Sequence, residues 1–341
     1  NVSIRGNGNA TILKRMYNST SADTASLITL NEKSGCKIQD LQIDGNKATY
    51  DSIYNYGIRL YSSSNNTITG NTCSNNNSGI VLSLSSNNTI TGNTCNNNYY
   101  DYGIYLYSSS NNTVTGNTCN NNSNIGIYLS SYSNNNMVTD NTCNNNKYGI
   151  NLSSSSNNTV TCNTCNNNKY NGINLYSSSN DNTITVNTCN NNENSGIDLY
   201  SSNNDTVTGN TCNNNKYGIY LSSYSNNNTV TGNTCNNNYY GIDLDSYNDD
   251  NTVTGNTCNN NRISGIDLYE SSNNTITGNT CIRGTGQPSD YDSNQYTIRL
   301  YSTGNNYNLI SSNNCMGKAV VIEGGTGNSV WGNKFDDTVE M

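Results

Sequence analysis

A cysteine that returns every 22 to 24 residues constrains this chain more than any other feature. It closes an Asn-Thr-Cys triplet within copies of a pattern such as NNTITGNTCNNN. Its positions are Cys73, Cys95, Cys119, Cys143, Cys165, Cys189, Cys212, Cys235, Cys258 and Cys281. A disordered segment has no reason to hold a repeat length this tightly, whereas a coil that must close and stack on the next one does. The spacing therefore predicts a solenoid, although 79 of the 341 residues are asparagine, a composition otherwise typical of disorder.

Composition and charge limit the class of protein. Only 31% of the residues are hydrophobic and the mean hydropathy is -0.75, so the core must be thin and long. A net charge of -8 and 15 Lys and Arg residues without a basic cluster argue against nucleic-acid binding. No run approaches the roughly 18 apolar residues of a membrane span. No charged-then-apolar leader precedes Asn1, so we expect a secreted protein whose export signal has been removed.

Each repeat predicts three short strands. The Gly-Ile-x-Leu segment (for example 103–106) and the Thr-[Ile/Val]-Thr segment (for example 113–115) alternate inward apolar and outward residues, as half-buried strands do. The cysteine segment predicts a third strand after a bend at the preceding glycine. Asparagine suits the corners because it tolerates positive φ. Equivalent asparagines about 4.8 Å apart in stacked coils can also form amide ladders.

The whole chain is predicted to be one all-β domain. No helical pattern separates the strands, and the repeat is too short for a propeller blade or a helix pair. A parallel β-solenoid of about thirteen coils of about 23 residues remains. We expect a single domain over residues 1–341, with irregular first coils in 1–56, regular repeats in 57–282, an inserted loop in 283–297 and the last coils in 298–341.

Three segments resemble a known family. The pattern GIYLSSYSNNNTVTGNTCNNN resembles the repeats of right-handed parallel β-helix proteins, which include secreted carbohydrate-binding and sugar-hydrolase proteins and NosD-type periplasmic copper-binding proteins. The segments NVSIRGNGNATIL and CKIQDLQIDGN resemble the first coils of pectate-lyase-like helices. The resemblance implies a right-handed, single-stranded parallel β-helix of an archaeal or bacterial surface type. Copper binding by this analogy lacks its commonest ligand, because the chain has no histidine.

The cysteine column has three interpretations. The first is a small apolar side chain that fills a narrow interior as an inert thiol. Stacked coils also lie within disulfide range, which would pair neighbouring cysteines and leave one of the thirteen unpaired. The third is a metal-binding thiolate ladder, which an apolar interior disfavours. Cys162 forms a CxxC with Cys165 but only replaces a corner glycine.

We expect no catalysis. The absence of histidine excludes Ser-His and Cys-His nucleophilic sites and His-based metal sites. Sugar hydrolysis needs two carboxyl groups about 5 to 10 Å apart. Carboxylates near the outward positions of the Gly-Ile-x-Leu strands could approach one another; they are Asp198, Asp243, Asp245 and Asp267. Tyr, Asn and Arg share this column, so we interpret it as a variable solvated face.

Two further sets are candidates for binding or modification. A cluster within GIDLDSYNDDN could hold Ca²⁺ through oxygen ligands, with a solvated acidic patch as the alternative, and we expect no other cofactor. Its carboxylates are Asp243, Asp245, Asp249 and Asp250. Asn-x-Ser/Thr sequons would suit a glycosylated surface. They include Asn65, Asn87, Asn111, Asn157, Asn227 and Asn273.

Outward threonine and tyrosine columns suggest binding surfaces. The Thr-x-Thr pairs, such as Thr113 and Thr115, would form two ranks that resemble the ice-binding faces of β-solenoid antifreeze proteins. The alternative is that threonine is simply a good strand residue. Tyrosine, with 27 residues against one Phe, suits contacts with glycans or proteins. The alternative is aromatic stacking that only stiffens the coils.

We interpret the chain as an extracellular structural protein. Strand-like segments at both ends would leave two different, complementary edges, and pairing them builds a filament, tube or sheath. A carbohydrate-binding or carbohydrate-active β-helix is the main alternative, and ice binding the second. The expected partners are further copies of the chain and, in the alternative, glycans.

Overall fold

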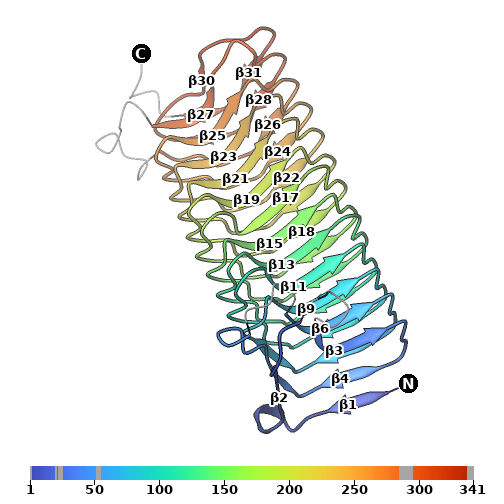
Figure 1. Cartoon of the computed structure of the whole chain (residues 1–341). Helices are drawn as coiled ribbons and strands as arrows, with labels where there is room; N and C mark the ends of the chain where they lie inside the picture. Colours follow the sequence, from blue (N-terminus) through green and yellow to red (C-terminus); the bar gives the residue numbers. More distant parts are fainter. Residues whose placement is uncertain (1, 20, 22–25, 51–54, 284–294, 336–341) are drawn as a thin grey trace. The chain divides into compact units, whose positions relative to one another are not determined.

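The computed structural model describes residues 2–19, 21, 26–50, 55–283 and 295–335. The chain divides into two compact units, unit 1 (residues 1–169) and unit 2 (residues 170–341), and each is described by itself. Both are built from the same coil of short strands and tight corners (Figure 1). Of the predicted inserted loop, only residues 283 and 295–297 are among the described residues.

Unit 1 contains three kinds of strand. The Gly-Ile-x-Leu strands are β3 (Ser26–Asn31), β6 (Tyr56–Tyr61), β9 (Ser78–Ser83), β11 (Tyr102–Tyr107), β13 (Ile125–Ser130) and β15 (Tyr148–Ser153). The Thr-x-Thr type are β1 (Ser3–Arg5), β4 (Lys37–Gln39), β7 (Thr67–Thr69), β10 (Thr89–Thr91), β12 (Thr113–Thr115), β14 (Met137–Thr139) and β16 (Thr159–Thr161). The third kind are β2 (Ile12–Lys14), β5 (Gln42–Asp44) and β8 (Thr72–Ser74), and a 3-10 turn, η1 (Gly8–Ala10), lies in the first coil.

Unit 2 repeats the arrangement. Its Gly-Ile-x-Leu strands are β17 (Ile173–Tyr176), β19 (Ser195–Tyr200), β21 (Tyr217–Ser222), β23 (Tyr240–Asp245), β25 (Ser264–Tyr269), β27 (Tyr296–Leu300) and β30 (Val321–Ile322). The Thr-x-Thr type are β18 (Thr183–Thr185), β20 (Thr206–Thr208), β22 (Thr229–Thr231), β24 (Thr252–Thr254), β26 (Thr275–Thr277), β28 (Leu309–Ser311) and β31 (Ser329–Trp331). The third kind are β29 (Asn314–Cys315) and β32 (Lys334–Phe335).

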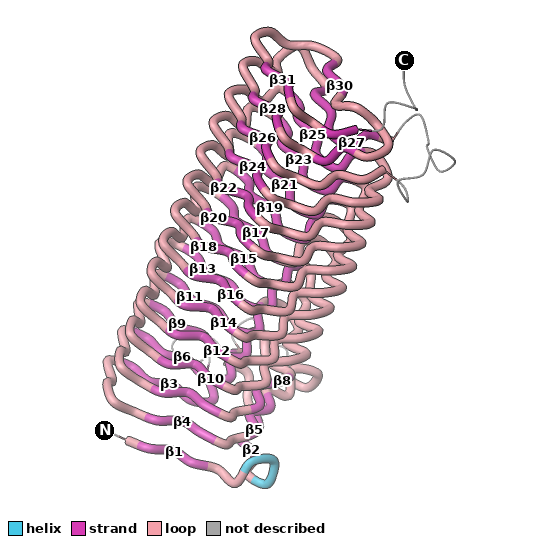
Figure 2. The backbone as a smooth tube through the Cα atoms, turned by 180° about the vertical axis from the view of Figure 1, so that it is seen from behind, coloured by secondary structure: helices cyan, strands magenta, loops and turns pink. Residues whose placement is uncertain are grey.

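Every pairing within each unit is parallel and joins equivalent positions of neighbouring coils. In unit 1, Ile104 of β11 pairs with Ile80 of β9 and with Ile127 of β13. Figure 2 shows the strands of one kind lying over one another from coil to coil. The predicted all-β parallel solenoid with coils of about 23 residues is therefore confirmed.

The third strand is shorter than predicted in most coils. In the coil of Cys95 it is a single bridge from Thr94 to Thr72 and to Thr118. Left-handed residues bound it on both sides, Gly92 at φ +62° and Asn97 at φ +56°. Only four residues lie between these corners, which limits the segment to a few paired positions; β8, between Gly70 and Asn75, has the same spacing and keeps three residues.

The interior is a narrow stack of apolar columns. Ile104, Leu106, Val114 and Cys119 of one such coil are fully buried. The glycine that opens each Gly-Ile-x-Leu strand explains the small cysteine, because a Cβ at Gly103 would lie 2.9 Å from the Cβ of Cys119 and 2.6 Å from a backbone oxygen. Each cysteine therefore lies in a space so narrow that the facing glycine has no room for a side chain.

Buried asparagines at the corners form the predicted amide ladders. The Nδ2 of Asn93 donates to the Oδ1 of Asn117 at 3.0 Å, and the Nδ2 of Asn117 donates to Asn141 in the same way at 3.0 Å. The same Oδ1 of Asn117 accepts the backbone N–H of Asn93 at 2.9 Å, and the Nδ2 of Asn93 also reaches the Ile68 carbonyl at 2.9 Å. The side chains thereby satisfy backbone groups that the corner removes from the strand ladders.

One ladder of unit 2 contains an aspartate that the sequence analysis did not single out. Asp205 takes a ladder position, and its Oδ1 accepts from the backbone N–H of Asn182 at 2.7 Å and from its Nδ2 at 3.2 Å. Its Oδ2 is buried and has no partner among the described residues. Burial raises the pKa of the Asp205 carboxyl well above its usual value, and the two bonds from Asn182 lower it only in part.

Among the described residues, no helix has the length and apolar character needed to cross a membrane.

We expect the Asp205→Asn variant to be more stable than the wild type at pH 7, by about 1 to 2 kcal/mol. A carboxyl whose pKa is raised on folding favours the folded state below its unfolded pKa of about 3.9, and this contribution is lost as the pH rises through the folded pKa. The variant should lose that pH dependence, which denaturant unfolding at several pH values measures. Asp250→Asn, at an exposed corner, is the matched control and should change neither quantity. Equal stability of wild type and Asp205→Asn at pH 7 would contradict the prediction.

One cysteine should differ from the others in its reactivity toward thiol reagents. Cys162 is exposed and the other twelve are buried as free thiols. Burial also raises the pKa of thiols such as Cys235 and Cys258, which keeps them protonated and unreactive. We expect one equivalent of rapid reaction with a thiol reagent in the folded protein, and all thirteen after unfolding without reductant. Fewer than thirteen after unfolding would instead indicate disulfides between coils.

Candidate functional site

The outward column of the Gly-Ile-x-Leu strands in unit 2 brings carboxylates, tyrosines and an arginine together. Parallel register places the x residue of each strand beside that of the next. The column runs Asn174, Asp198, Tyr220, Asp243, Asp267 and Arg299 on β17, β19, β21, β23, β25 and β27. Successive members are about 4.8 Å apart along the stack because this is the spacing of hydrogen-bonded strands. We call these six residues the carboxylate face.

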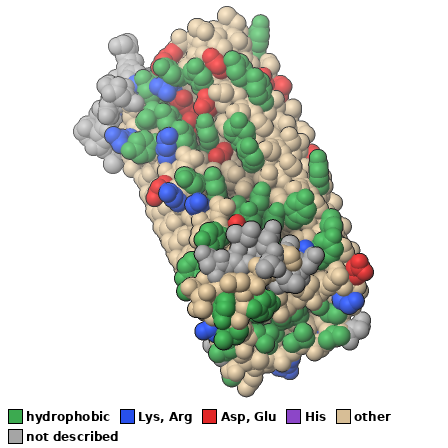
Figure 3. Space-filling view, viewed as in Figure 1, with side chains coloured by type: hydrophobic (Ala, Val, Ile, Leu, Met, Phe, Trp, Pro, Cys, Tyr) green, Lys and Arg blue, Asp and Glu red, His purple; other side chains and the backbone are tan. Residues whose placement is uncertain are grey.

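The prediction of a solvated face is wrong for its three aspartates. Asp198, Asp243 and Asp267 are only 9%, 6% and 4% exposed. Tyrosine rings cover this side of the sheet, and the ring of Tyr217 lies 4.4 Å from that of Tyr220 and 5.3 Å from that of Tyr240. Figure 3 shows acidic side chains among hydrophobic ones on this side of unit 2. The burial could not be predicted from the sequence pattern, because each outward position was considered without the side chains of neighbouring coils.

Asp267 is held by Arg299. The Arg299 Nε donates to Oδ1 at 2.8 Å and Nη2 donates to Oδ2 at 3.3 Å, a two-pronged ion pair. The guanidinium also lies over the rings of Tyr296 and Tyr301, at 4.8 and 4.4 Å. Burial raises the pKa of Asp267, and the arginine opposes this shift, so that the pKa settles at about 6.

Asp243 and Asp198 have no such cation as a direct partner among the described residues. Burial first, and then the negative charges of Asp267 and Asp245, raise the pKa of Asp243 well above its usual value. Burial raises the pKa of Asp198 to about 7, although the Asn171 Nδ2 donates to its Oδ2 at 2.8 Å. The other oxygen of Asp198, Oδ1, is buried without a partner among the described residues. Neighbouring carboxylates on one face therefore differ in their protonation near neutral pH.

The tyrosines of this face remain protonated. Burial raises the pKa of Tyr217 and of Tyr240 to about 12. The Tyr220 hydroxyl donates to the Oδ2 of Asp245 at 2.8 Å, and burial together with this bond raises the pKa of Tyr220 further. These hydroxyls are hydrogen-bond donors and acceptors at physiological pH, not bases.

The four aspartates proposed for calcium do not converge. Asp243 belongs to the carboxylate face, whereas Asp245 accepts from Tyr220 and from the Ser246 hydroxyl at 2.8 Å. The Oδ1 of Asp249 accepts a backbone N–H of the next coil at 2.7 Å, and Asp250 occupies an exposed corner with φ +59°. No group of three or more His, Cys, Asp or Glu side chains that could hold a metal occurs in the part of the chain that the structure describes.

The sequons lie where a modifying enzyme can reach them. All six asparagines named above occupy exposed corner positions with φ near +57°. Glycosylation of these asparagines stays a prediction.

The parallel pairing of equivalent strands defines a class of protein, the parallel β-solenoids. The model of the right-handed β-helix region matches residues 26–188 and 182–335, and the chain belongs to this family. No curated protein matches the chain by sequence.

Several solved structures share the fold at low identity. The A-module of a mannuronan C-5 epimerase from Azotobacter vinelandii is 15% identical, with 95% of this chain and 90% of that chain covered and a TM-score of 0.65. A surface adhesin of Streptococcus pneumoniae is 14% identical, with 83% and 82% covered and a TM-score of 0.62. The Dettilon tailspike protein is 17% identical, with 92% and 62% covered and a TM-score of 0.59.

These comparisons correct the prediction that the chain is not an enzyme. Similar structures include epimerases, which are enzymes built on this fold. The fold for which we expected no catalysis therefore also occurs in enzymes.

The ion pair between Arg299 and Asp267 can be tested by its pH dependence. Arg299→Gln leaves Asp267 buried without its cation, so we expect a loss of stability of about 2 to 4 kcal/mol at pH 8. Because the pKa of Asp267 then rises further, the carboxyl is protonated at pH 5 and the loss there should be smaller. Urea unfolding at both pH values measures this. Arg299→Gln with Asp267→Asn should recover most of the stability at pH 8, and an equal loss at both pH values would contradict the ion pair's role.

Proposed function

We propose that this protein is a carbohydrate-active β-helix of the cell exterior, which binds a polysaccharide over the carboxylate face and hydrolyses it there. The observation that carries the proposal is the pair Asp243 and Asp267. They occupy paired positions on β23 and β25, are both buried on an outward face, and differ in what holds them. An ordinary structural face has no need for two neighbouring buried carboxyl groups, since their burial costs stability.

The two carboxyl groups have the states that glycoside hydrolysis requires. Asp243, with its pKa raised by burial and by neighbouring negative charges, is protonated near neutral pH and acts as the general acid. Asp267, whose pKa is about 6, is ionised at neutral pH and acts as the nucleophile or general base. The strand spacing of about 4.8 Å is close to the separation of about 5 to 5.5 Å typical of retaining enzymes.

Tyrosines supply the binding surface around this pair. Tyr217, Tyr220 and Tyr240 form a stacked aromatic cluster, and their hydroxyls stay protonated. Aromatic rings with polar tips suit the apolar faces and hydroxyls of sugars. An adhesin and a tailspike among the similar structures support a place outside the cell.

The test is release of reducing ends from a panel of polysaccharides. We expect at least one substrate, and a loss of about 100-fold or more in kcat for Asp243→Asn and for Asp267→Asn. Activity should fall below about pH 6 as Asp267 becomes protonated. Asp250→Asn makes the same chemical change at an exposed corner and should keep full activity. Full activity of Asp243→Asn on every substrate cleaved by the wild type would refute the proposal.

Two other functions stay predictions. The threonine ranks exist in each unit, with Thr89 between Thr67 and Thr113 and Thr229 between Thr206 and Thr252. Exposed Met137 interrupts the rank of unit 1, which weighs against a continuous ice-binding lattice. The second is end-to-end assembly into a filament, and the geometry of the carboxylate face does not bear on it.

A further inference from the structure

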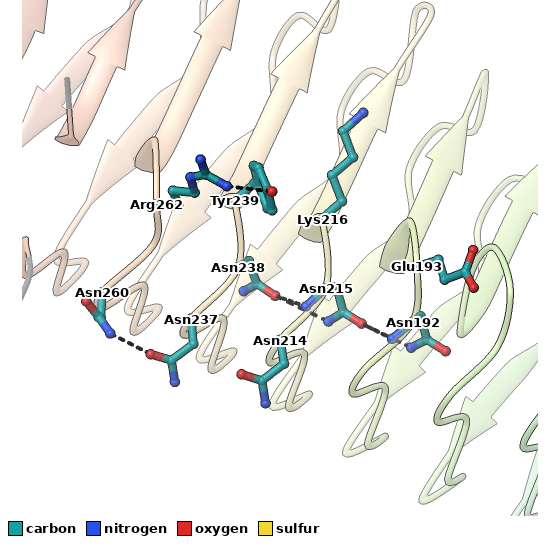
Figure 4. Close-up of a pocket in the computed structure, with 10 residues that line it drawn as sticks. All are labelled: Asn192, Glu193, Asn214, Asn215, Lys216, Asn237, Asn238, Tyr239, Asn260 and Arg262. Atoms are coloured by element: carbon teal, nitrogen blue, oxygen red, sulfur yellow. Dashed lines mark hydrogen bonds between the residues drawn. The ribbon is translucent and has the colours of Figure 1, made fainter.

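A groove of about 510 Å³ follows one corner of unit 2, outside the carboxylate face. It lies at the asparagine run that precedes each Gly-Ile-x-Leu strand (Figure 4). The residue after the buried asparagine of each coil lines it, and in four successive coils these residues are Glu193, Lys216, Tyr239 and Arg262. All four side chains are exposed. The groove therefore presents a different side chain in each coil on the same backbone.

The floor and outer edge of the groove are amides held in fixed orientations. The Nδ2 of Asn192 donates to the Oδ1 of Asn215 at 3.2 Å, and Asn215 donates to Asn238 at 3.3 Å. At the exposed edge, the Nδ2 of Asn260 donates to the Oδ1 of Asn237 at 2.8 Å. The groove is therefore a row of hydrogen-bonding groups repeated every coil, which suits a polymer that also repeats along its length.

Basic residues concentrate at this corner. The same position of the repeat holds Lys147 and Lys169 in unit 1, and Lys216 and Arg262 in unit 2. Four of the 15 Lys and Arg residues thus share one repeat position in a chain whose net charge is -8. Within unit 2, Lys216 and Arg262 therefore create a local site for anions on an acidic protein.

The basic residues of the groove are paired with aromatic rings. The guanidinium of Arg262 lies 4.7 Å from the ring centre of Tyr239, and its Nη1 donates to the Tyr239 hydroxyl at 2.6 Å. The Lys216 Nζ lies 4.8 Å from the ring centre of Tyr217. A fixed guanidinium beside a ring offers a carboxylate or sulfate two donors and offers a sugar ring an apolar surface.

We infer that this corner groove binds an acidic polysaccharide, one that carries carboxylate or sulfate groups along its length. It is an anchoring site distinct from the carboxylate face, because an ionised Asp267 repels the same anions that Lys216 and Arg262 attract. The inference rests on the proposed carbohydrate function for its class of ligand, although it does not depend on hydrolysis.

A second groove provides an internal comparison. In unit 1 a groove of about 300 Å³ is lined by amides, Tyr99 and Ser123, and by no Lys or Arg among its described lining residues. The same corner architecture without cations lacks the means to select anions. The charge of Lys216 and Arg262, rather than the fold of the corner, is therefore the basis of the inferred selectivity.

Binding of polygalacturonate, dextran sulfate and neutral dextran tests the inference, by titration calorimetry on the full chain. We expect both acidic polymers to bind and dextran not to, with affinity falling as salt rises from 0.05 to 0.5 M. Lys216→Gln and Arg262→Gln should each weaken binding about threefold and the double variant about tenfold. Lys334→Gln, which removes an exposed charge elsewhere in unit 2, should bind as the wild type does.

The controls keep this result separate from the proposed hydrolysis. Asp243→Asn should bind the acidic polymers as tightly as the wild type, whether or not the protein cleaves any sugar. Wild-type affinity in the double variant, equal binding of neutral dextran, or an equal loss in Lys334→Gln would each overturn the inference. Equal binding of single-stranded DNA would also overturn it, because the groove would then attract any polyanion.

Discussion

The buried amide ladder is the interaction on which the rest of this structure depends. Each asparagine of a ladder, such as Asn117, binds backbone and side-chain groups of its neighbours in the stack. These bonds satisfy the corner, where parallel strands end and the backbone would otherwise be left without partners. With the corners fixed, a core only a few side chains wide is sufficient, which is how a chain with 31% hydrophobic residues folds.

The parallel register of the strands brings the side chains of the carboxylate face together. Because equivalent positions stack in parallel, a substitution in one repeat is placed beside substitutions in the next. Asp243 and Asp267 are one repeat apart in sequence and become neighbours on paired strands, with Arg299 beside them on the following strand. The repetition that makes the coils look uniform thus creates a cluster wherever neighbouring copies depart from the consensus.

The period of the cysteines and the alternation of apolar residues were sufficient to predict the strands, the interior columns and the ladders. These features are local and repeat in every coil, so each copy strengthens the same inference. The burial of Asp198, Asp243 and Asp267 could not be predicted in this way, since it depends on tyrosine rings from neighbouring coils. The position of Asp205 within a ladder was visible in the sequence as an aspartate in the place of an asparagine, but its unpartnered oxygen was not. The length of the third strand could not be predicted, because the same spacing of left-handed corners encloses the three-residue β8 in one coil and a single bridge at Thr94 in the next.

The corner position that carries Glu193, Lys216, Tyr239 and Arg262 in successive coils has a consequence for how such proteins change over time. Each of these side chains sits on an almost unchanged backbone, so mutation at this position can alter ligand preference without a new fold or loop. Duplication of a 23-residue segment would add a further subsite of any chosen chemistry to the row. Proteins of this type can therefore change which ligands they bind one repeat at a time.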